Sequence, residues 1–420
     1  MKRYIVLSNL LLTLFCNQAK EVSLDASKSL TGLSLDLIGS NYVSQNDDTP
    51  GPEFLAVGVG CTVWTSNDGE NWSARGGSGV FPGCSGGSLY SVAYGNGTWV
   101  AVGTLIYSYV TRANNAGIWT SKDGETWTQV TAPVDSGYAT ISPTLPLRSV
   151  SYGKVGGVNK FIAAGTKLGQ YSGAVDRLYI IQSTDGVNWT TFENLPTFGY
   201  GSFYGSCYVT FYNDKFYCPS EYGEYEMALE YDPANPPAAG SPMTSFPNGT
   251  GHSLESLSYA PPPAGVYDLY GFHLYPARSG AFYVFGNLLS NGDAIVSKLG
   301  SNGKWPASTS IGLGANNYPH GFVDFGDHVY AFGNNCRWSY SNDQGASWSM
   351  VSTLDLCGGS AGYNDWIDAT YSSKLNRMVV VGDGGSIGTT NIAPSSSSDW
   401  KYVKAAGVSL EITSVVSKHK

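Results

Sequence analysis

Charged residues are scarce in this chain. Only 13% of its 420 residues are Asp, Glu, Lys or Arg, whereas it contains 53 glycines, 29 tyrosines and 11 tryptophans. Disordered chains and coiled coils are richer in charge and poorer in aromatic residues. Abundant glycine and aromatic residues are typical of many short strands joined by tight turns. We therefore expect an all-β fold.

Basic residues are also few. The 23 lysines and arginines are outnumbered by 32 acidic residues, and the formal net charge is −9. Nucleic acids and anionic lipid surfaces attract basic proteins electrostatically. We expect no nucleic-acid partner, and contact with a membrane only through a lipid anchor.

The N-terminus lacks a hydrophobic run of membrane-spanning length. Two cations precede a mostly apolar stretch from Tyr4 to Phe15, which is too short for a permanent transmembrane helix and is typical of an export signal over residues 1–16. The adjoining Cys16 resembles the lipidation site of a bacterial lipoprotein, although Phe15 is larger than the residue usually found there. The alternative is cleavage after Ala19, which would remove Cys16. We expect an exported protein, either a cell-surface or outer-membrane lipoprotein or a secreted one.

Four copies of one short motif divide the sequence. They are SNDGENW, SKDGETW, STDGVNW and SNDQGASW. In each, Ser and Asp can bind backbone groups of a turn, Gly can adopt positive φ, and Trp can pack between sheets. The motifs resemble Asp boxes, the BNR repeats of sialidases and many other β-propellers, where they hold turns and take no part in catalysis. The residues to which this structural role is assigned are Ser66, Asp68, Trp72, Ser121, Asp123, Trp127, Ser183, Asp185, Trp189, Ser341, Asp343 and Trp348.

The similarity extends beyond the motifs to a repeating unit of four strands. The segments SVAYGNGTWVAVGT and SVSYGKVGGVNKFIAAGT each contain a strand, a Gly-rich turn and a second strand before the motif. Second strands are predicted at seven places: Phe54, Trp99, Phe161, Phe216, Phe282, Val329 and Met378. The first of them has no strand before it. We predict a seven-bladed β-propeller over residues 51–420, tethered by residues 17–50 and closed by Leu410 to Val416 pairing beside Phe54 to Gly58.

Cysteine placement follows the repeat. Setting Cys16 aside leaves six cysteines, which in an exported chain suggest three disulfides. Cys61 and Cys336 each lie five residues before a motif serine, and Cys84 and Cys357 follow the motif tryptophans at similar intervals. We predict the disulfides Cys61–Cys84, Cys336–Cys357 and Cys207–Cys218. The chain has no CxxC pair, and its five histidines do not cluster near the cysteines, so we expect neither a metal nor another cofactor.

A ligand site is expected on the face opposite the motifs, where the predicted loops are long. Aligning the first strands places seven residues at the mouth of the central channel: Tyr90, Arg148, Cys207, Glu255, Gly321, Ile367 and Thr413. Arginine can bind a carboxylate or a sugar, and tyrosines offer flat faces to pyranose rings. Our candidate ligand-binding residues are Arg148, Glu255, Tyr90, Tyr107, Arg112, Tyr171, Arg177 and Tyr222. The alternative is that Arg148 and Glu255 only neutralise each other.

Catalytic signatures are missing. A sialidase needs an arginine trio and an Arg-Ile-Pro-type motif before the first Asp box, but TPGPEFLAVGVGCTVW contains no arginine. No other established catalytic motif is present, and we assign no catalytic residue. We expect a monomeric binding propeller for a glycan or protein ligand. The alternatives are a divergent sialidase-like or other glycoside hydrolase and an assembly or scaffold factor.

Overall fold

The computed structural model describes residues 49–106, 116–133, 144–167, 177–191, 208–218, 229–231, 243–245, 269–288, 292–301, 308–314, 317–351, 365–404 and 410–420. All of these residues belong to one compact unit, Tyr42–Lys420. The predicted export signal and almost all of the predicted tether lie outside the described ranges and remain predictions. Within those ranges, no helix has the length and apolar character needed to cross a membrane.

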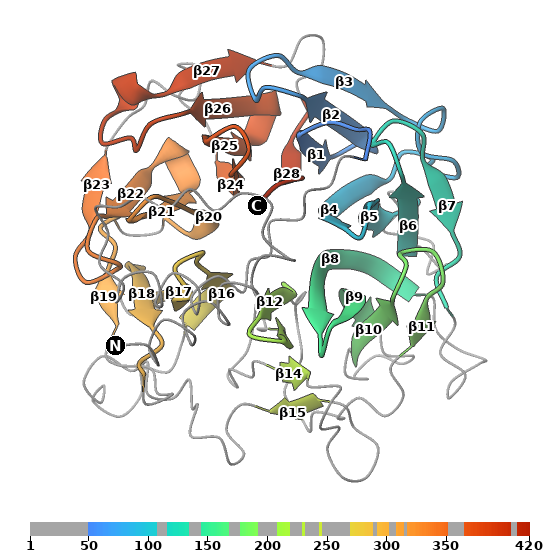
Figure 1. Cartoon of the computed structure of the whole chain (residues 1–420), viewed down its shortest axis with the longest axis horizontal. Coiled ribbons are helices and arrows are strands. Elements are labelled where there is room, and N and C mark those ends of the chain that lie inside the picture. The colour runs from blue at the N-terminus through green and yellow to red at the C-terminus, as the bar shows by residue number, and fades with distance from the viewer. Residues whose placement is uncertain are drawn as a thin grey trace, which may run out of the picture. The chain divides into compact units, whose positions relative to one another are not determined.

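The compact unit contains seven four-stranded antiparallel sheets, which we number as blades in chain order (Figure 1). Blade 1 contains β28 (Ile412–Ser417), β1 (Phe54–Gly58), β2 (Thr62–Ser66) and β3 (Ser73–Gly76). Blade 2 contains β4 (Ser88–Gly95), β5 (Thr98–Thr104), β6 (Ala116–Ser121) and β7 (Thr128–Val130), and blade 3 contains β8 (Thr144–Val155), β9 (Val158–Lys167), β10 (Arg177–Ser183) and β11 (Thr190–Thr191). Blade 4 contains β12 (Thr210–Tyr212), β13 (Lys215–Cys218), β14 (Leu229–Tyr231) and β15 (Met243–Ser245).

The remaining blades follow the same order. Blade 5 contains β16 (Leu269–Pro276), β17 (Phe282–Leu288), β18 (Ala294–Lys298) and β19 (Thr309–Ser310), and blade 6 contains β20 (Pro319–Phe325), β21 (His328–Gly333), β22 (Trp338–Ser341) and β23 (Ser349–Val351). Blade 7 contains β24 (Trp366–Ser372), β25 (Arg377–Gly382), β26 (Ser386–Thr390) and β27 (Lys401–Lys404). The 3₁₀ turns in the described residues are η3 (Asn334–Cys336), η4 (Asp383–Gly385) and η5 (Ser397–Asp399). All seven second strands lie where the sequence predicts them.

The ring closes as predicted, because β28 pairs antiparallel with β1 and supplies the inner strand that blade 1 otherwise lacks. The first strand of every blade faces the middle of the ring (Figure 1). Polar side chains join these inner strands to their neighbours. The Thr413 hydroxyl donates to the Leu89 carbonyl oxygen of blade 2 (2.8 Å), and the Ser149 hydroxyl oxygen accepts from the Val209 amide of blade 4 (2.8 Å). This is the seven-bladed β-propeller expected from the sequence, with its two terminal edges paired to each other.

Apolar side chains fill the spaces between blades. Between blades 1 and 2, for example, Leu55, Val57 and Phe81 form one buried cluster with Trp99 and Trp119. The Phe81 ring lies 4.9 Å from that of Trp127, measured between centroids. Aromatic groups of this size provide most of the apolar area that a stack of thin sheets can bury. Each blade is therefore stabilised chiefly by its neighbours.

The four Ser–Asp motifs form nearly identical turns between the third and fourth strands of blades 1, 2, 3 and 6. In each, the serine hydroxyl donates to the aspartate carboxylate, at 3.0, 2.9, 2.9 and 2.8 Å in chain order. In blade 3 the Gly186 amide donates to the Ser183 hydroxyl oxygen (2.9 Å), and the Asp185 carboxylate accepts from the Val187 and Asn188 amides (both 2.8 Å). These carboxylates bind the backbone of their own turns.

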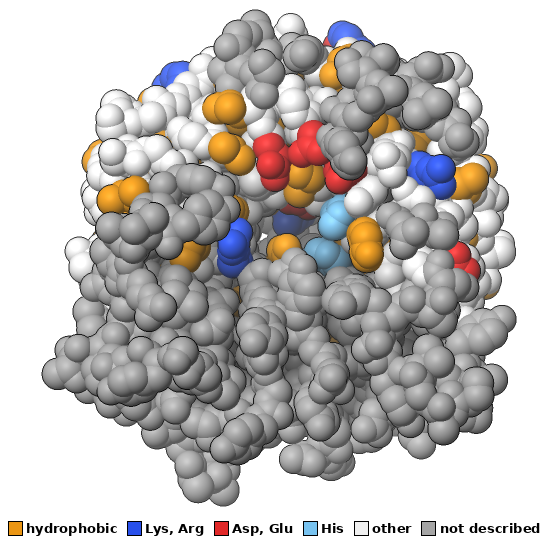
Figure 2. Space-filling view, turned by 180° about the vertical axis from the view of Figure 1, so that it is seen from behind, with side chains coloured by type: hydrophobic (Ala, Val, Ile, Leu, Met, Phe, Trp, Pro, Cys, Tyr) orange, Lys and Arg blue, Asp and Glu red, His pale blue; other side chains and the backbone are white. Residues whose placement is uncertain are grey.

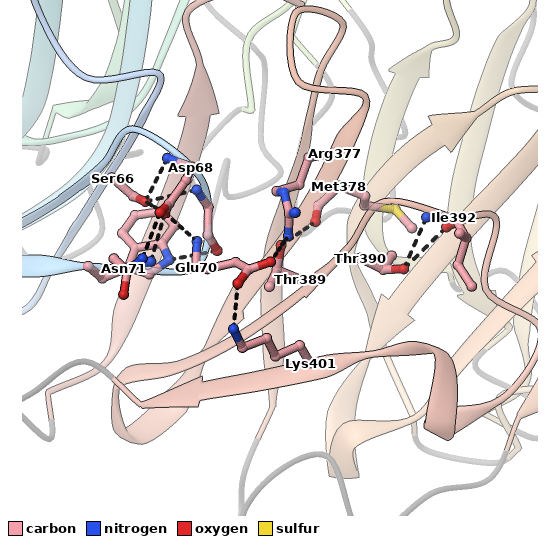
Figure 3. A network of polar contacts seen from close by, with 12 residues as sticks. Ser66, Asp68, Glu70, Asn71, Arg377, Met378, Thr389, Thr390, Ile392 and Lys401 are labelled. Carbon is pink, nitrogen blue, oxygen red and sulfur yellow. Dashed lines mark hydrogen bonds and ion pairs between the residues drawn. The ribbon is translucent and has the colours of Figure 1, made fainter.

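One motif also joins blade 1 to blade 7. The Glu70 carboxylate of the first motif lies between Arg377 on β25 and Lys401 on β27 (Figure 3). The distance from Arg377 Nη1 to Glu70 Oε1 is 2.8 Å, and the same guanidinium donates to the Thr389 hydroxyl (3.3 Å). The network therefore reinforces the junction at which the two ends of the ring meet.

Acid should weaken the Ser–Asp turns. Partial burial raises the pKa of Asp185, but hydrogen bonds from Asn188, Val187 and Ser183 outweigh it and lower the pKa from 3.8 to about 2. A lowered folded-state pKa stabilises the fold above pH 3.8, and this contribution is lost as the pH falls towards about 2. Asp185→Asn should therefore flatten the decline in the free energy of unfolding across this range, measured by urea denaturation at several pH values.

The control for this experiment is Asp327→Asn in the exposed β20–β21 turn, which should leave the decline unchanged. An Asp185→Asn profile that is parallel to the wild-type profile would show that this turn does not contribute to acid sensitivity.

The predicted disulfides have different outcomes. Cys61 and Cys84 form a disulfide that joins the β1–β2 turn to the segment after β3, as predicted. Cys336 is also disulfide-bonded, but its predicted partner, Cys357, lies outside the described residues. Cys207 lies outside them as well, so its pairing with Cys218 remains a prediction.

Candidate functional site

The blades have two different ends. The Ser–Asp turns lie at one end, which we call the motif face. The inner strands begin at the other end, where the turns between second and third strands also lie; we call it the loop-rich face. Figure 2 shows a hollow in the middle of one face, with acidic side chains at one rim, histidines beside them and a basic side chain at another edge.

A β-bulge recurs near the start of the inner strands on the loop-rich face. The register shifts by one residue at Tyr90 in β4, Arg148 in β8, His320 in β20, Ile367 in β24 and Thr413 in β28. A similar shift lies between Tyr270 and His273 in β16. A bulge redirects the side chain of the extra residue and increases strand twist. Six of the seven inner strands therefore carry an extra residue near the mouth of the channel.

A glycine on the second strand makes room for each of five bulges. A Cβ atom on Gly382 would lie 2.0 Å from the Asp365 carbonyl oxygen, and one on Gly103 would lie 2.0 Å from that of Ser88. The distance from an added Cβ atom to the nearest backbone carbonyl oxygen is 2.1 Å at Gly58, 2.5 Å at Gly165 and 2.3 Å at Gly333. No side chain fits where the two backbones approach so closely. These glycines explain the repeated Val-Gly, Ala-Gly and Phe-Gly pairs at the ends of the second strands.

Three carboxylates lie close together at the mouth on blades 7 and 1. Asp365 directly precedes β24, Asp383 lies in η4 between β25 and β26, and Glu411 directly precedes β28. The Asp365 amide donates to the Asp383 carboxylate (3.1 Å). Burial and the charges of Asp383 and Asp365 raise the pKa of Glu411. Burial also raises the pKa of Asp383; the hydrogen bond from the Asp365 amide opposes this shift, and the charge of Asp365 adds a smaller contribution to it.

The turn η3 of blade 6 extends this polar group around the mouth. The Asn335 amide donates to the Asp365 carboxylate (2.9 Å), and the Asn334 side-chain oxygen lies 2.8 Å from Nε2 of His320. Asn335 and Cys336 adopt left-handed conformations with φ of 55° and 57°. This turn therefore holds groups from blades 6 and 7 in one arrangement.

Basic and aromatic groups complete the described part of the mouth. The Arg148 guanidinium lies over the Tyr90 ring, 4.2 Å from its centroid, and the Arg148 side chain is exposed. The rings of His273 and His320 lie 6.1 Å apart. Burial, with a smaller contribution from the charge of His320, lowers the pKa of His273 to about 3, so His273 is neutral at pH 7. The mouth thus combines carboxylates, an arginine, neutral imidazole and aromatic faces.

Below the mouth, Asp368 lies on the inner strand β24. Its carboxylate accepts from the Val415 amide (2.9 Å) and the Ser414 hydroxyl (3.0 Å) of blade 1. Burial raises the pKa of Asp368, and these hydrogen bonds and the charge of Lys420 oppose the shift. Asp368 therefore has a structural role at the ring junction. No group of His, Cys, Asp and Glu suited to a metal ion is found within the described part of the chain.

Only part of the predicted site can be located. Tyr90 and Arg148 lie together at the mouth, and Ile367 and Thr413 lie at equivalent bulges, as predicted. Arg177 begins β10 at the loop-rich end of blade 3. The remaining predicted residues, Tyr107, Arg112, Tyr171, Cys207, Tyr222 and Glu255, lie outside the described residues.

Two alignments were wrong. The residue equivalent to Tyr90 and Arg148 in blade 6 is His320 and not Gly321, because the bulge shifts the register by one residue there. In blade 5 the inner strand is β16 (Leu269–Pro276), which pairs with β17, so Glu255 does not lie on that strand. Alternation of apolar and polar residues around Ser256 resembles a strand, but the inner position is taken by a later segment.

Sequence reasoning missed Asp365, Asp383, Glu411, His320 and the Asn334–Asn335 pair. Each lies in a different turn or strand start and belongs to no contiguous motif. A usable signal was nevertheless present, because Gly333 and Gly382 each end a second strand and are directly followed by Asn334 and Asp383. The glycine that accommodates a bulge also marks the turn that reaches the mouth.

Comparison with known proteins supports the fold alone. No family model matches the chain, and no curated protein matches it. An ancestral GH74 enzyme of solved structure has a TM-score of 0.50 and 13% identity, and the match covers 78% of this chain and 44% of that one. YCF48 from Cyanidioschyzon merolae has a TM-score of 0.46 and 14% identity over 78% of this chain and 87% of its own. YCF48 bound to D1 peptide has a TM-score of 0.44 and 14% identity over 75% of this chain and 80% of its own. The chain is a seven-bladed β-propeller.

Proposed function

We propose that this chain is a binding propeller that recognises a protein or glycan ligand on its loop-rich face. The observation that supports this most directly is the difference between the two faces. On the motif face, the aspartates Asp68, Asp123, Asp185 and Asp343 bind the backbone of their own turns. On the loop-rich face, the channel mouth carries Arg148 beside the Tyr90 ring on one side and the carboxylates of Asp383 and Glu411 on another. Loops and channel mouths on a rigid scaffold are common places for binding sites.

We further propose that the protein is exported and anchored through Cys16, and that the Ser–Asp motifs are Asp boxes. Export is supported by the apolar stretch after Lys2 and Arg3 and by the disulfide Cys61–Cys84, since disulfides persist in oxidising compartments. Metabolic labelling with palmitate tests the anchor. A mature protein that carries no label would exclude it.

A glycoside hydrolase is the second candidate, and the raised pKa values of Asp383 and Glu411 favour it. A carboxyl group with a raised pKa can act as a general acid, while a neighbouring ionised carboxylate acts as base or nucleophile. In this proposal Glu411 would be the acid and Asp365 its neighbouring carboxylate. The absence of sialidase signatures from the sequence weighs against a sialidase in particular. A third candidate, an assembly or scaffold factor, would use the same face for a protein ligand.

Binding and turnover can be measured side by side. The full chain is applied to a glycan array and a peptide array and is incubated with a panel of fluorogenic glycosides. We expect binding without turnover, and we expect the triple variant Asp365→Asn, Asp383→Asn, Glu411→Gln to lower the affinity at least about tenfold. Asp327→Asn on the motif face is the control and should bind like the wild type.

Turnover that is lost in Glu411→Gln would replace the binding proposal with the hydrolase. Binding that survives the triple variant but is lost in variants of the motif face would show that the loop-rich face is not the site.

A further inference from the structure

The inner-strand positions on either side of the bulge have the same structural role in successive blades. The residue before the bulge is apolar and buried; these residues are Leu89, Leu147, Pro319, Trp366 and Ile412. The residue after the bulge touches the next blade. The Ser91 hydroxyl oxygen accepts from the Val150 amide (3.2 Å), the Ser149 hydroxyl oxygen accepts from the Val209 amide, and the Asp368 carboxylate accepts from the Val415 amide. Both flanking positions are therefore restricted by packing.

The bulged position itself is not restricted in this way. It carries a different kind of side chain in each blade, namely Tyr90, Arg148, His320, Ile367 and Thr413, and none of these side chains is buried. Thr413 has a structural role in the propeller, since its hydroxyl donates to backbone carbonyl oxygens of blades 1 and 2. The other four keep side-chain surface at the mouth. A position with a fixed backbone and a free choice of side chain is suited to determine specificity.

The charges around the mouth are unevenly distributed. Arg148 on blade 3 contacts the Tyr90 ring and makes no ion pair with a carboxylate of the described residues. Asp365, Asp383 and Glu411 lie on blades 7 and 1, and blade 2 with Tyr90 lies between the two groups. Burial is the main cause of the raised pKa values of Asp383 and Glu411, and repulsion by the neighbouring carboxylates adds to it. A cation near the carboxylates would relieve this repulsion, and an anion would pair with Arg148.

We propose that the bulge residues Tyr90, Arg148, His320 and Ile367 form a ligand-contacting ring, and that the ligand is a peptide segment with charges of both signs. This inference rests on the proposed binding function and decides between its two ligand classes. A ligand of one sign would be attracted at one side of the mouth and repelled at the other. An uncharged sugar would cover Arg148 and the carboxylates without pairing them, at a cost in desolvation. A peptide can place a basic and an acidic side chain within a few residues of each other.

The test uses the full chain and four arrayed sets of synthetic peptides of equal length, which are acidic, basic, mixed or neutral in charge. Fluorescence anisotropy then measures affinity for the strongest binders and for neutral oligosaccharides. We expect mixed-charge peptides to bind about tenfold more tightly than peptides of one sign, since each desolvated charge pair contributes about that factor. Arg148→Ala and Glu411→Gln should each weaken the mixed-charge peptide about tenfold.

The controls match each charge change at a distance from the mouth. Arg75→Ala removes an arginine on the outer strand β3, and Asp327→Asn removes a carboxylate charge on the motif face; both should leave affinity unchanged. Arg148→Glu makes the mouth uniformly acidic and should move the preference from mixed-charge to basic peptides. A gain of that kind cannot result from misfolding.

The outcomes separate this inference from the proposed function. Equal binding of single-sign and mixed-charge peptides, or full affinity in Arg148→Ala, would overturn the proposed ligand-contacting ring of bulge residues. It would not overturn the proposal that the chain is a binding propeller. Binding of neutral oligosaccharides but no peptides would overturn the proposal that the ligand is a peptide, and it would also leave the binding propeller in place. Binding that is lost only in motif-face variants would overturn both proposals.

Discussion

Gly382→Ala should lower the free energy of unfolding by about 3 kcal/mol, the upper part of the range for forcing extra atoms into a packed site. The new Cβ atom would lie 2.0 Å from the Asp365 carbonyl oxygen and 3.1 Å from the Trp366 Cα atom. Both neighbours are backbone, so the bulge itself must move. Urea denaturation monitored by tryptophan fluorescence measures the change. Because Asp365 precedes the displaced bulge, ligand affinity at the mouth should also fall.

Gly79→Ala is the matched control. A Cβ atom on Gly79 would meet nothing within 4 Å, and its φ lies outside the left-handed region. The substitution should leave stability unchanged or raise it slightly, because alanine restricts the unfolded chain more than glycine does. If Gly382→Ala is as stable as Gly79→Ala, the bulge of blade 7 can shift freely and the explanation of the repeated glycines is wrong.

The repeat made the scaffold predictable from the sequence. The hydrophobic second strands are buried on both faces, and in four blades a turn motif follows them; the repeated strand pattern located all seven, from Phe54 to Met378. The missing inner strand of blade 1 then required a partner from the end of the ring, and β28 supplies it. These features depend on local patterns repeated many times.

The mouth was harder to predict because it depends on register. A bulge adds one residue and so shifts the alternation of apolar and polar residues by one within the strand, and the alignment selected Gly321 where the structure has His320. The carboxylates of Asp365, Asp383 and Glu411 come from three separate chain segments, and only the closed ring brings blades 7 and 1 together. Such a site has no linear signature.

The repeated glycines connect the scaffold to the site. Each allows an inner strand to bulge, and Gly58, Gly333 and Gly382 also end their strands, directly before a turn on the loop-rich face. The same residues therefore set both the twist of the blade and the position of the side chains around the mouth. Blades can then differ at the bulged residue while keeping the same backbone, as Tyr90 and Arg148 do.

Glu53→Ala should also destabilise the protein by about 3 kcal/mol, because it removes a buried carboxylate that accepts several hydrogen bonds. The Glu53 side chain is 5% exposed and that of His419 is 14% exposed, with 2.7 Å between Glu53 Oε2 and His419 Nδ1. The same carboxylate accepts from the Ser372 hydroxyl of blade 7 and the His419 amide. Removing it would leave buried donors unpaired where the residues after β28 cross between blades 7 and 1.

Hydrogen exchange can show where this loss acts. Amides of β28 and β1 should exchange faster in Glu53→Ala, whereas those of β9 in blade 3 should be less affected, because the junction opens before the rest of the ring. Glu125→Ala is the control: its carboxylate is 62% exposed and lies 3.7 Å from Arg75, so its loss should cost about 0.5 kcal/mol or less. Equal destabilisation by the two variants would mean that the Glu53–His419 contact contributes no more than a surface ion pair and that the strand pairing of β28 alone closes the ring.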